Sequence, residues 1–184
     1  MADPQHIPEL DGFDRMTVGL YRLGLVVSVL GVGGLAGALV RSAPAGPWQL
    51  LTFVGVALTV PNLHLYAKHV RWVIHVAAWT GAVLTALVPM LHSEAAHWVG
   101  HAGLGFLFVV LSALALKERF CFRLPGLRLV PLFLAGSLVP MVLRIPHVAG
   151  WMLVPAAVLL LILAIAKLRM PLHFDVGDKS RYQV

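Results

Sequence analysis

Charged residues are scarce in this chain of 184 residues, since they make up only 12% of the sequence. An average soluble domain carries about 25% charged residues, which keep its surface in water. Hydrophobic residues account for 59% of the chain instead. This composition excludes an ordinary water-soluble domain and predicts an integral membrane protein whose main partner is the lipid bilayer.

Acidic residues are the rarest charged type, and only Glu94 and Glu118 lie between residues 15 and 174. The predicted membrane spans therefore hold too few carboxylates for paired-carboxylate chemistry. The same shortage argues against a carboxylate-driven proton or cation transporter, because the pathways of such transporters usually carry Asp or Glu at membrane depth. The formal net charge of +6 does not indicate a nucleic-acid partner, since the basic residues do not gather on a soluble module.

Cysteine occurs once, at Cys121, which excludes an intramolecular disulfide, a CxxC redox pair and a cysteine-rich zinc site. The sequence also lacks the HExxH, GxSxG, Walker and Rossmann motifs. We therefore expect a non-enzymatic protein. One enzymatic alternative stays open, because Lys117, Arg119 and Arg123 would favour a reactive thiolate at Cys121 that acts on lipid headgroups. An inert thiol in a positively charged loop is the simpler interpretation.

Long hydrophobic runs are what the sequence has in place of charge. Six windows approach the roughly 20 apolar residues that a helix needs to cross a hydrocarbon core about 30 Å thick. They cover residues 17–40, 48–66, 70–91, 97–116, 127–143 and 149–167. The fifth is the weakest, because it is short and contains Pro131 and Pro140. The predicted fold is an all-α, polytopic transmembrane helical bundle with six spans, or five if the fifth window does not cross.

Basic residues fall mostly on one side of this predicted bundle. If the N-terminus is cytoplasmic, the inner segments hold twelve Lys and Arg residues and the outer segments hold only Arg41 and Arg144. The positive-inside rule then places both termini in the cytoplasm. We expect a cytoplasmic N-terminal segment (1–15), a single transmembrane bundle (16–168) and a cytoplasmic tail (169–184) that is either flexible or docked on the bundle.

Several basic residues lie at the inner ends of the predicted spans. Those expected to contact anionic lipid headgroups are Lys68, Arg71, Arg119 and Arg128. Arg22 lies within the first span, only seven residues after Arg15. We expect its side chain to snorkel to the inner headgroups rather than to find a buried partner.

Small and aromatic residues indicate how the predicted helices pack. Gly33 and Gly37 are four apart on one face of the first span, which would let another helix approach closely. Trp72, His75 and Trp79 share one face of the third span. This pattern favours packing against a neighbouring helix over the alternative, the binding of a flat cofactor.

Four histidines are predicted to lie at the outer face. His92, His97 and His101 bracket the loop between the third and fourth spans, and His147 lies in the last outer loop. Zinc, copper or haem iron could take such imidazoles as ligands. We favour a structural or proton-responsive role, because an i, i+4 histidine pair alone is a weak signal. No cofactor is therefore expected, and a metal- or haem-binding membrane protein is the alternative hypothesis.

The stretch ERFCF (118–122) closes the fourth span and leads through LPG (124–126) into the fifth. It resembles the corresponding segment of a prokaryotic family of uncharacterised integral membrane proteins, the domain of unknown function 2301. The residues that carry the resemblance are Glu118, Cys121, Phe122 and Arg123. The resemblance implies a bacterial inner-membrane protein and supplies no catalytic residues.

The absence of large soluble parts predicts that this chain acts within the bilayer. The expected function is that of a non-enzymatic accessory or assembly subunit of a membrane complex, or of a small carrier. A membrane-protein partner or a homo-oligomer fits the first of these roles.

Overall fold

A computed structural model describes residues 9–65, 67–122, 124 and 126–176, without the side chains of 120–122. All regular structure in these ranges is helical, which confirms the predicted all-α class. The longer helices are α1 (Gly12–Val40), α2 (Gly46–Thr59), α3 (Lys68–Leu87), α4 (Ser93–Phe122), α5 (Val130–Val142) and α6 (Pro146–Arg169). The short ones are η1 (Val88–Met90), η2 (Leu127–Leu129) and α7 (His173–Val176).

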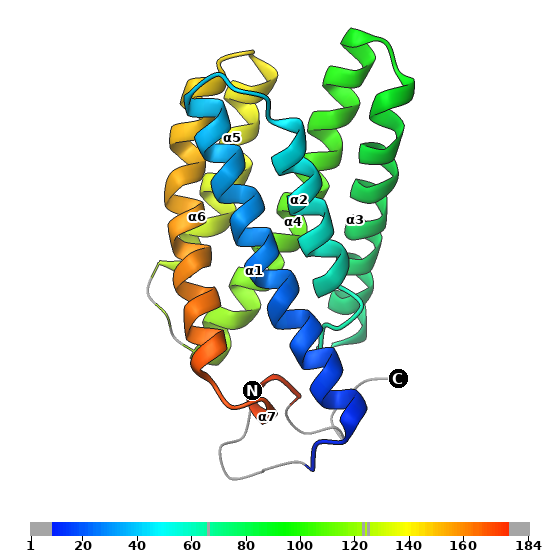
Figure 1. Ribbon diagram of the computed structural model, residues 1–184, viewed down its shortest axis with the longest axis vertical. Coiled ribbons are helices and arrows are strands. Elements are labelled where there is room, and N and C mark those ends of the chain that lie inside the picture. The colour runs from blue at the N-terminus through cyan, green and yellow to red at the C-terminus, as the bar shows by residue number, and fades with distance from the viewer. Residues whose placement is uncertain (1–8, 66, 123, 125, 177–184) are drawn as a thin grey trace.

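The six longer helices run alternately up and down, so that neighbours in sequence are antiparallel (Figure 1). The end at which α1, α3 and α5 begin also holds α7 (Figure 1), and we call it the charged end. α1 packs along α2 and α6, α4 packs along α3 and α5, and α5 packs along α6. α2 contacts α3 and α4 only sparsely, so the bundle has one loose seam between α2 and the α3–α4 pair.

Four helical segments are long and apolar enough to cross a membrane: Gly12–Val40, Lys68–Met90, Ser93–Arg119 and Pro146–Arg169. The other two candidates are shorter, since α2 has 14 residues and α5 has 13. At about 1.5 Å per residue, α2 is about 21 Å long, which is less than the hydrocarbon thickness of about 30 Å. By length and composition, four helical segments are thus candidate spans, and a total of six spans stays a prediction.

The predicted windows and the observed helices differ mainly at their ends. The second window reaches residue 66, but α2 ends at Thr59, directly before Val60 and Pro61. Pro61 has no N–H to donate, so the helical hydrogen bonding stops after Val60, which still has helical backbone angles. The first helix begins five residues before its window, because Asp11 and Asp14 form a capping box.

Glycine and small polar residues join α1 to α2. A Cβ atom added to Gly24 would lie 2.7 Å from the carbonyl oxygen of Gly55, and one added to Gly55 would lie 2.7 Å from Cα of Ser28. The helix backbones therefore approach closely at these positions. The prediction for Gly33 and Gly37 is corrected, because a Cβ at Gly33 would meet only Ala157 at 4.0 Å and one at Gly37 only Arg41 of the same helix at 3.6 Å.

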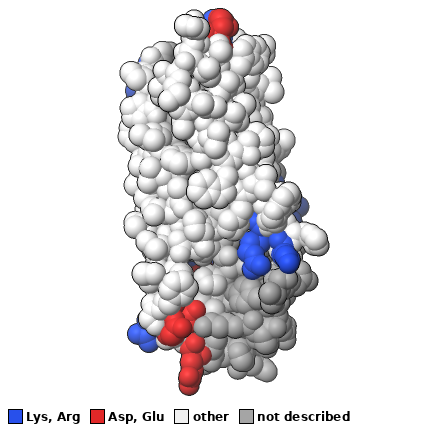
Figure 2. Space-filling model, turned by 90° about the vertical axis from the view of Figure 1, so that its right-hand side faces the viewer, with Lys and Arg blue, Asp and Glu red and all other residues white. Residues whose placement is uncertain are grey.

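α3 lies at the edge of the bundle and buries only Ile74, Ala77 and Gly81. Trp72 and Trp79 are 66% and 67% exposed, so the predicted packing of this aromatic face against a neighbouring helix is wrong. These side chains instead face the outside of the bundle, as apolar groups do when lipid is their solvent. Figure 2 shows the surface on the α3 side, where a broad uncharged band separates charged groups above and below it.

Candidate functional site at the charged end

Ionisable side chains are buried at the charged end of the bundle. They come from four separate helices: α1, α4, α6 and the tail helix α7. We call this set the ion cluster, and it consists of Tyr21, Arg22, Lys117, Glu118, Lys167 and Asp175. Such groups are costly in an apolar interior unless they are paired and hydrogen-bonded.

Glu118 is the centre of the ion cluster and is 0% exposed. The hydroxyl of Tyr21 donates a hydrogen bond to its Oε1 at 2.6 Å. The ammonium of Lys167 lies 2.9 Å from Oε2, and that of Lys117 lies 3.3 Å from Oε1. Two positive charges and one hydroxyl therefore compensate a carboxylate that water does not reach.

Asp175 is the second carboxylate of the ion cluster, and side chains from two helices, α1 and α6, bind it. Its Oδ2 accepts hydrogen bonds from Nε of Arg22 at 2.8 Å and from Nη2 of Arg22 at 2.5 Å. Its Oδ1 pairs with the ammonium of Lys167. Because Lys167 also pairs with Glu118, it bridges the two carboxylates and connects α4, α6 and α7.

Arg22 fastens the segment after α6 to the bundle. Besides Asp175, its guanidinium donates to the carbonyl oxygens of Met170 at 2.7 Å and Pro171 at 3.0 Å. The prediction that Arg22 snorkels to lipid headgroups is therefore wrong, because the returning tail supplies a buried partner. Of the two alternatives for the tail, the structure shows the docked one for residues 170–176.

The ion cluster carries more positive than negative charge. Arg22, Lys117 and Lys167 supply three positive charges, and Glu118 and Asp175 supply two negative ones. The formal net charge of these five side chains is therefore +1. The ammonium groups of Lys117 and Lys167 lie 5.0 and 5.6 Å from the ring centroid of Tyr21, within the range of a cation–π interaction.

An open cleft of about 420 Å³ adjoins the ion cluster. Its lining residues are Asp11, Phe13, Asp14, Leu63, His64, Arg71 and Val176. Burial lowers the pKa of His64, and the positive charge of Lys117 lowers it further. Val176 belongs both to the cleft and to the tail helix, so the cleft reaches the segment that carries Asp175.

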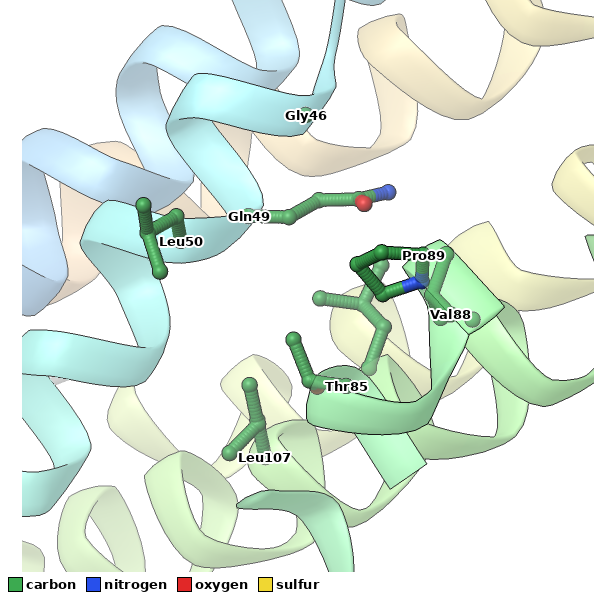
Figure 3. Close-up of a pocket in the computed structure, with 9 residues that line it drawn as sticks. Gly46, Gln49, Leu50, Thr85, Val88, Pro89 and Leu107 are labelled. Carbon is green, nitrogen blue, oxygen red and sulfur yellow. The ribbon is translucent and has the colours of Figure 1, made fainter. Parts of the chain in front are cut away.

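A second hollow lies in the loose seam, towards the opposite end of the bundle. Its volume is about 210 Å³. Figure 3 shows it between α2 and the end of α3, where the Gln49 side chain extends towards Pro89. Most of the other lining side chains, including Leu50, Val88 and Leu107, are apolar. The hollow is therefore a lateral gap between helices and lacks a cluster of charged groups.

The four predicted outer histidines are brought together only in part. The rings of His97 and His101 lie with centroids 4.3 Å apart, and Nδ1 of His101 is 2.6 Å from the carbonyl oxygen of His97. His92 and His147 are exposed. Within the described ranges, no group of three or more His, Cys, Asp or Glu residues is placed to hold a metal ion. Structural metal sites usually take four ligands, so one histidine pair is incomplete.

The other predicted residues lie mostly at the charged end. Lys68, Arg119 and Arg128 are exposed there, whereas Arg71 is half-buried and lines the cleft. Of the proposed signature residues, Glu118 is the centre of the ion cluster. Cys121 and Phe122 belong to the last turn of α4, but their side chains, like Arg123 as a whole, lie outside the described residues.

Sequence reasoning missed most of the ion cluster. Tyr21 and Asp175 have no predicted role. Lys117 and Lys167 enter only through the charge count that orients the bundle and, for Lys117, as a neighbour of Cys121. The sequence does show that Arg22 and Lys167 are cations at the edges of apolar runs. Charged side chains in such places usually pair with an opposite charge or with backbone carbonyl groups. The sequence could not show that this partner is a carboxylate 153 residues away from Arg22.

Comparisons with known proteins agree with the resemblance seen in the sequence. Residues 51–184 match the family model of the domain of unknown function 2301, which is described as an uncharacterized integral membrane protein. A protein of Haemophilus influenzae, described as uncharacterized, is 37% identical over 186 residues, covering 100% of both chains. No solved structure matches the chain. The resemblance inferred from residues 118–126 is thereby confirmed.

Proposed function

Because the chain belongs to the domain of unknown function 2301 family of integral membrane proteins, we propose that it is a non-enzymatic small carrier of the bacterial inner membrane. The observation that carries this proposal is the buried ion cluster. Ionisable side chains inside membrane proteins are costly, and they commonly mark a substrate or ion pathway. The cluster also adjoins an open cleft, which would give a solute access from one side of the membrane.

The proposal includes six spans with both termini in the cytoplasm. In the alternating arrangement, nine described Lys and Arg residues lie at the charged end. They are Arg15, Arg22, Lys68, Arg71, Lys117, Arg119, Arg128, Lys167 and Arg169. Of the Lys and Arg residues that the structure describes, only Arg41 and Arg144 lie at the opposite end, so the positive-inside rule favours a cytoplasmic charged end. Local thinning of the bilayer would let the short helices α2 and α5 cross.

The loose seam supports a carrier over a rigid scaffold. α1, α2 and α6 pack closely with one another through α1, whereas α2 barely contacts α3 and α4. Weak packing at this seam lets α2 and the α3–α4 pair shift relative to each other at low cost, while α5, which packs on both α4 and α6, keeps the bundle together. The ion cluster connects α1 and α6 with α4, because Tyr21 and Lys167 both contact Glu118.

Solute uptake into proteoliposomes tests the proposed function. The purified chain is reconstituted, and stopped-flow light scattering follows the entry of sodium acetate, sodium phosphate, glycerol and methylammonium chloride. We expect uptake of at least one of these solutes, and its loss in Glu118→Gln, which removes a charge from the ion cluster. Glu94→Gln is the matched control, because Glu94 is an exposed carboxylate at the opposite end. Uptake equal to that of empty liposomes for every solute would overturn the carrier proposal.

An accessory subunit is the second candidate, and the outward face of α3 favours it. This face carries Trp72, Trp79 and Val83, each more than half exposed, and could receive a helix of another membrane protein or of a second copy. A photoreactive residue in place of Trp79 tests this in native membranes. A defined adduct at Trp79, absent when the same residue replaces Leu132 on α5, would support a partner. Labelling of lipid alone would oppose one.

The proposed carrier works without a metal or haem. If the protein does bind a metal or haem, the ligands would come from the histidine pair on α4 and from the exposed His92 and His147. Elemental analysis and a visible spectrum of the purified protein provide the measurement. Stoichiometric zinc or copper, or a Soret band lost in His97→Ala, would overturn this part of the proposal and favour the metal- or haem-binding alternative.

A further inference from the structure

The tail segment, residues 170–176, places one carboxylate into a group of cations that belong to the helical bundle. We propose that the position of the Asp175 carboxylate is an anion-binding site for carboxylate or phosphate groups, and that the tail is an internal ligand that blocks it. This inference rests on the proposed carrier function and gives the chemical class of its substrate.

The cations around Asp175 have the geometry of an oxyanion site. Arg22 directs two N–H groups at one carboxylate oxygen, at 2.8 and 2.5 Å, and Lys167 pairs with the other oxygen. The side chains of Arg22 and Lys167 are only 8% and 2% exposed, so the charges act with little screening by water. A guanidinium fork with an adjacent ammonium suits carboxylate and phosphate oxygens equally well.

The charges of the described ion cluster favour an anion at this position. With Asp175 in place, the cluster holds three cations and two carboxylates. Without it, Arg22 loses the carboxylate that it binds, and Lys167 loses one of its two described carboxylate partners. Such a loss in a buried site is strongly unfavourable, and any accessible oxyanion would reduce it. Glu118 cannot serve both purposes, because Tyr21, Lys117 and Lys167 already engage its two oxygens.

The tail can leave without disturbing the membrane helices. α6 ends at Arg169, and Met170 has an extended backbone, so the tail begins outside the helical bundle. The bundle-side hydrogen bonds to its backbone include two from Arg22 to carbonyl oxygens, and the N–H of Met170 donates to the carbonyl oxygen of Lys167. α7 is a single turn, and its opening exposes Val176 and breaks the ion pairs of Asp175 with Arg22 and Lys167, which an incoming oxyanion would restore. Val176, next to Asp175, lines the open cleft, so this part of the tail already borders a space that water can enter.

Anion binding to Asp175→Ala tests the inference in the full-length protein. The purified variant in a neutral detergent is titrated with potassium acetate and with potassium phosphate, against potassium chloride at equal ionic strength, while its unfolding temperature is followed. We expect acetate and phosphate to raise the unfolding temperature and chloride to have little effect. Because the tail blocks the site in the wild type, apparent binding should be about tenfold or more weaker there.

Two sources of the anion are separated by a second titration. The same variant is reconstituted into nanodiscs of phosphatidylcholine, with or without phosphatidylglycerol. Stabilisation by soluble acetate or phosphate in phosphatidylcholine alone assigns the site to a solute. Stabilisation only with phosphatidylglycerol assigns it to a lipid phosphate, and the site itself stands in either case. An equal response to chloride and to both oxyanions, with no effect of phosphatidylglycerol, would overturn the inference.

Controls separate a binding site from a structural defect. Asp175→Ala combined with Arg22→Gln should lose the oxyanion effect, whereas Glu94→Ala, which removes an exposed carboxylate, should respond as the wild type does. If Asp175→Ala does not fold, the wild type provides a second measurement. Hydrogen exchange of residues 170–176 should speed up in saturating phosphate, because the anion displaces the tail. Exchange that stays the same in phosphate and in chloride would overturn the inference.

The binding result and the transport result can be told apart. Specific oxyanion binding without solute uptake into proteoliposomes would retain the anion site and reject the carrier function. Uptake of glycerol or methylammonium by a protein that binds no oxyanion would retain a carrier and reject the anion site.

Discussion

Glu118 shows at the scale of one residue how much the ion cluster depends on pairing. Its carboxylate is fully buried, and its oxygens face Tyr21, Lys117 and Lys167. Sequence reasoning identified Glu118 as a family-signature residue but could not assign its partners, because contacts between distant helices leave no local pattern. Arg22 was misjudged for the same reason, since its carboxylate partner is 153 residues away.

Neutralising Glu118 should strongly destabilise the protein. Glu118→Gln leaves Lys117 and Lys167 without the charge that compensates them, and breaking a buried ion pair costs about 3 to 5 kcal/mol. We expect a clearly lower unfolding temperature in detergent, measured by intrinsic tryptophan fluorescence. Glu94→Gln, at an exposed ion pair with Arg144, should leave the unfolding temperature unchanged. Equal effects of the two substitutions would contradict the assigned burial.

His64 should make the stability of the protein depend on pH. Burial and the charge of Lys117 lower its pKa in the folded protein. As the pH falls through the ordinary range of histidine, the unfolded chain takes up a proton that folded His64 does not, so the free energy of unfolding decreases. The unfolding temperature should fall between about pH 7.5 and 5.5, and less steeply in His64→Gln. A His147→Gln control, at an exposed position, should keep the wild-type slope.

At the scale of elements, the hydrophobic pattern located the helices and missed some of their ends. Each of the six windows contains a helix, because a run of apolar residues is a direct consequence of the bilayer solvent. The sequence contains the signals for two of the missed ends, which are Pro61 after α2 and the capping box of Asp11 and Asp14 before α1. The predicted windows follow the apolar runs instead. The single turn α7 has no hydrophobic pattern that would predict it, because contacts to α1 and α6 hold it in place.

The contact between α1 and α2 predicts which glycines tolerate a methyl group. Gly55→Ala would place its Cβ within 2.7 Å of Cα of Ser28, so the helices must separate. Overpacking of this kind costs about 1 to 3 kcal/mol. Gly33→Ala is the matched control, because its Cβ would lie 4.0 Å from that of Ala157. Thermal unfolding in detergent should show a loss for Gly55→Ala and no loss for Gly33→Ala. A similar loss for both would reject the assigned interface.

At the scale of the whole molecule, composition predicted the membrane and the charge count suggested an orientation. The all-helical class and the family were confirmed, and four of the six predicted spans reach full length. The number of crossings and the side of each end remain proposals, because α2 and α5 are short. The fine organisation into segments 1–15, 16–168 and 169–184 likewise stays a prediction.

Thiol labelling checks the proposed orientation. In a Cys121→Ser background, single cysteines are placed at Arg128, at the charged end, and at His147, at the opposite end, both exposed positions. A membrane-impermeant maleimide applied to spheroplasts should label His147→Cys, whereas Arg128→Cys should react only after lysis. The reverse pattern would place the charged end in the periplasm, and labelling of both would reject an intact membrane-spanning arrangement.

The bond between Arg22 and Asp175 has a consequence for biosynthesis. The two residues are 153 positions apart, and translation at about 5 to 20 residues per second separates their synthesis by about 8 to 30 s. During that interval α1 is already made while its arginine has no tail carboxylate to bind. The charged end is therefore completed only after Asp175 has left the ribosome, and the first helix is fixed by a residue made long after it.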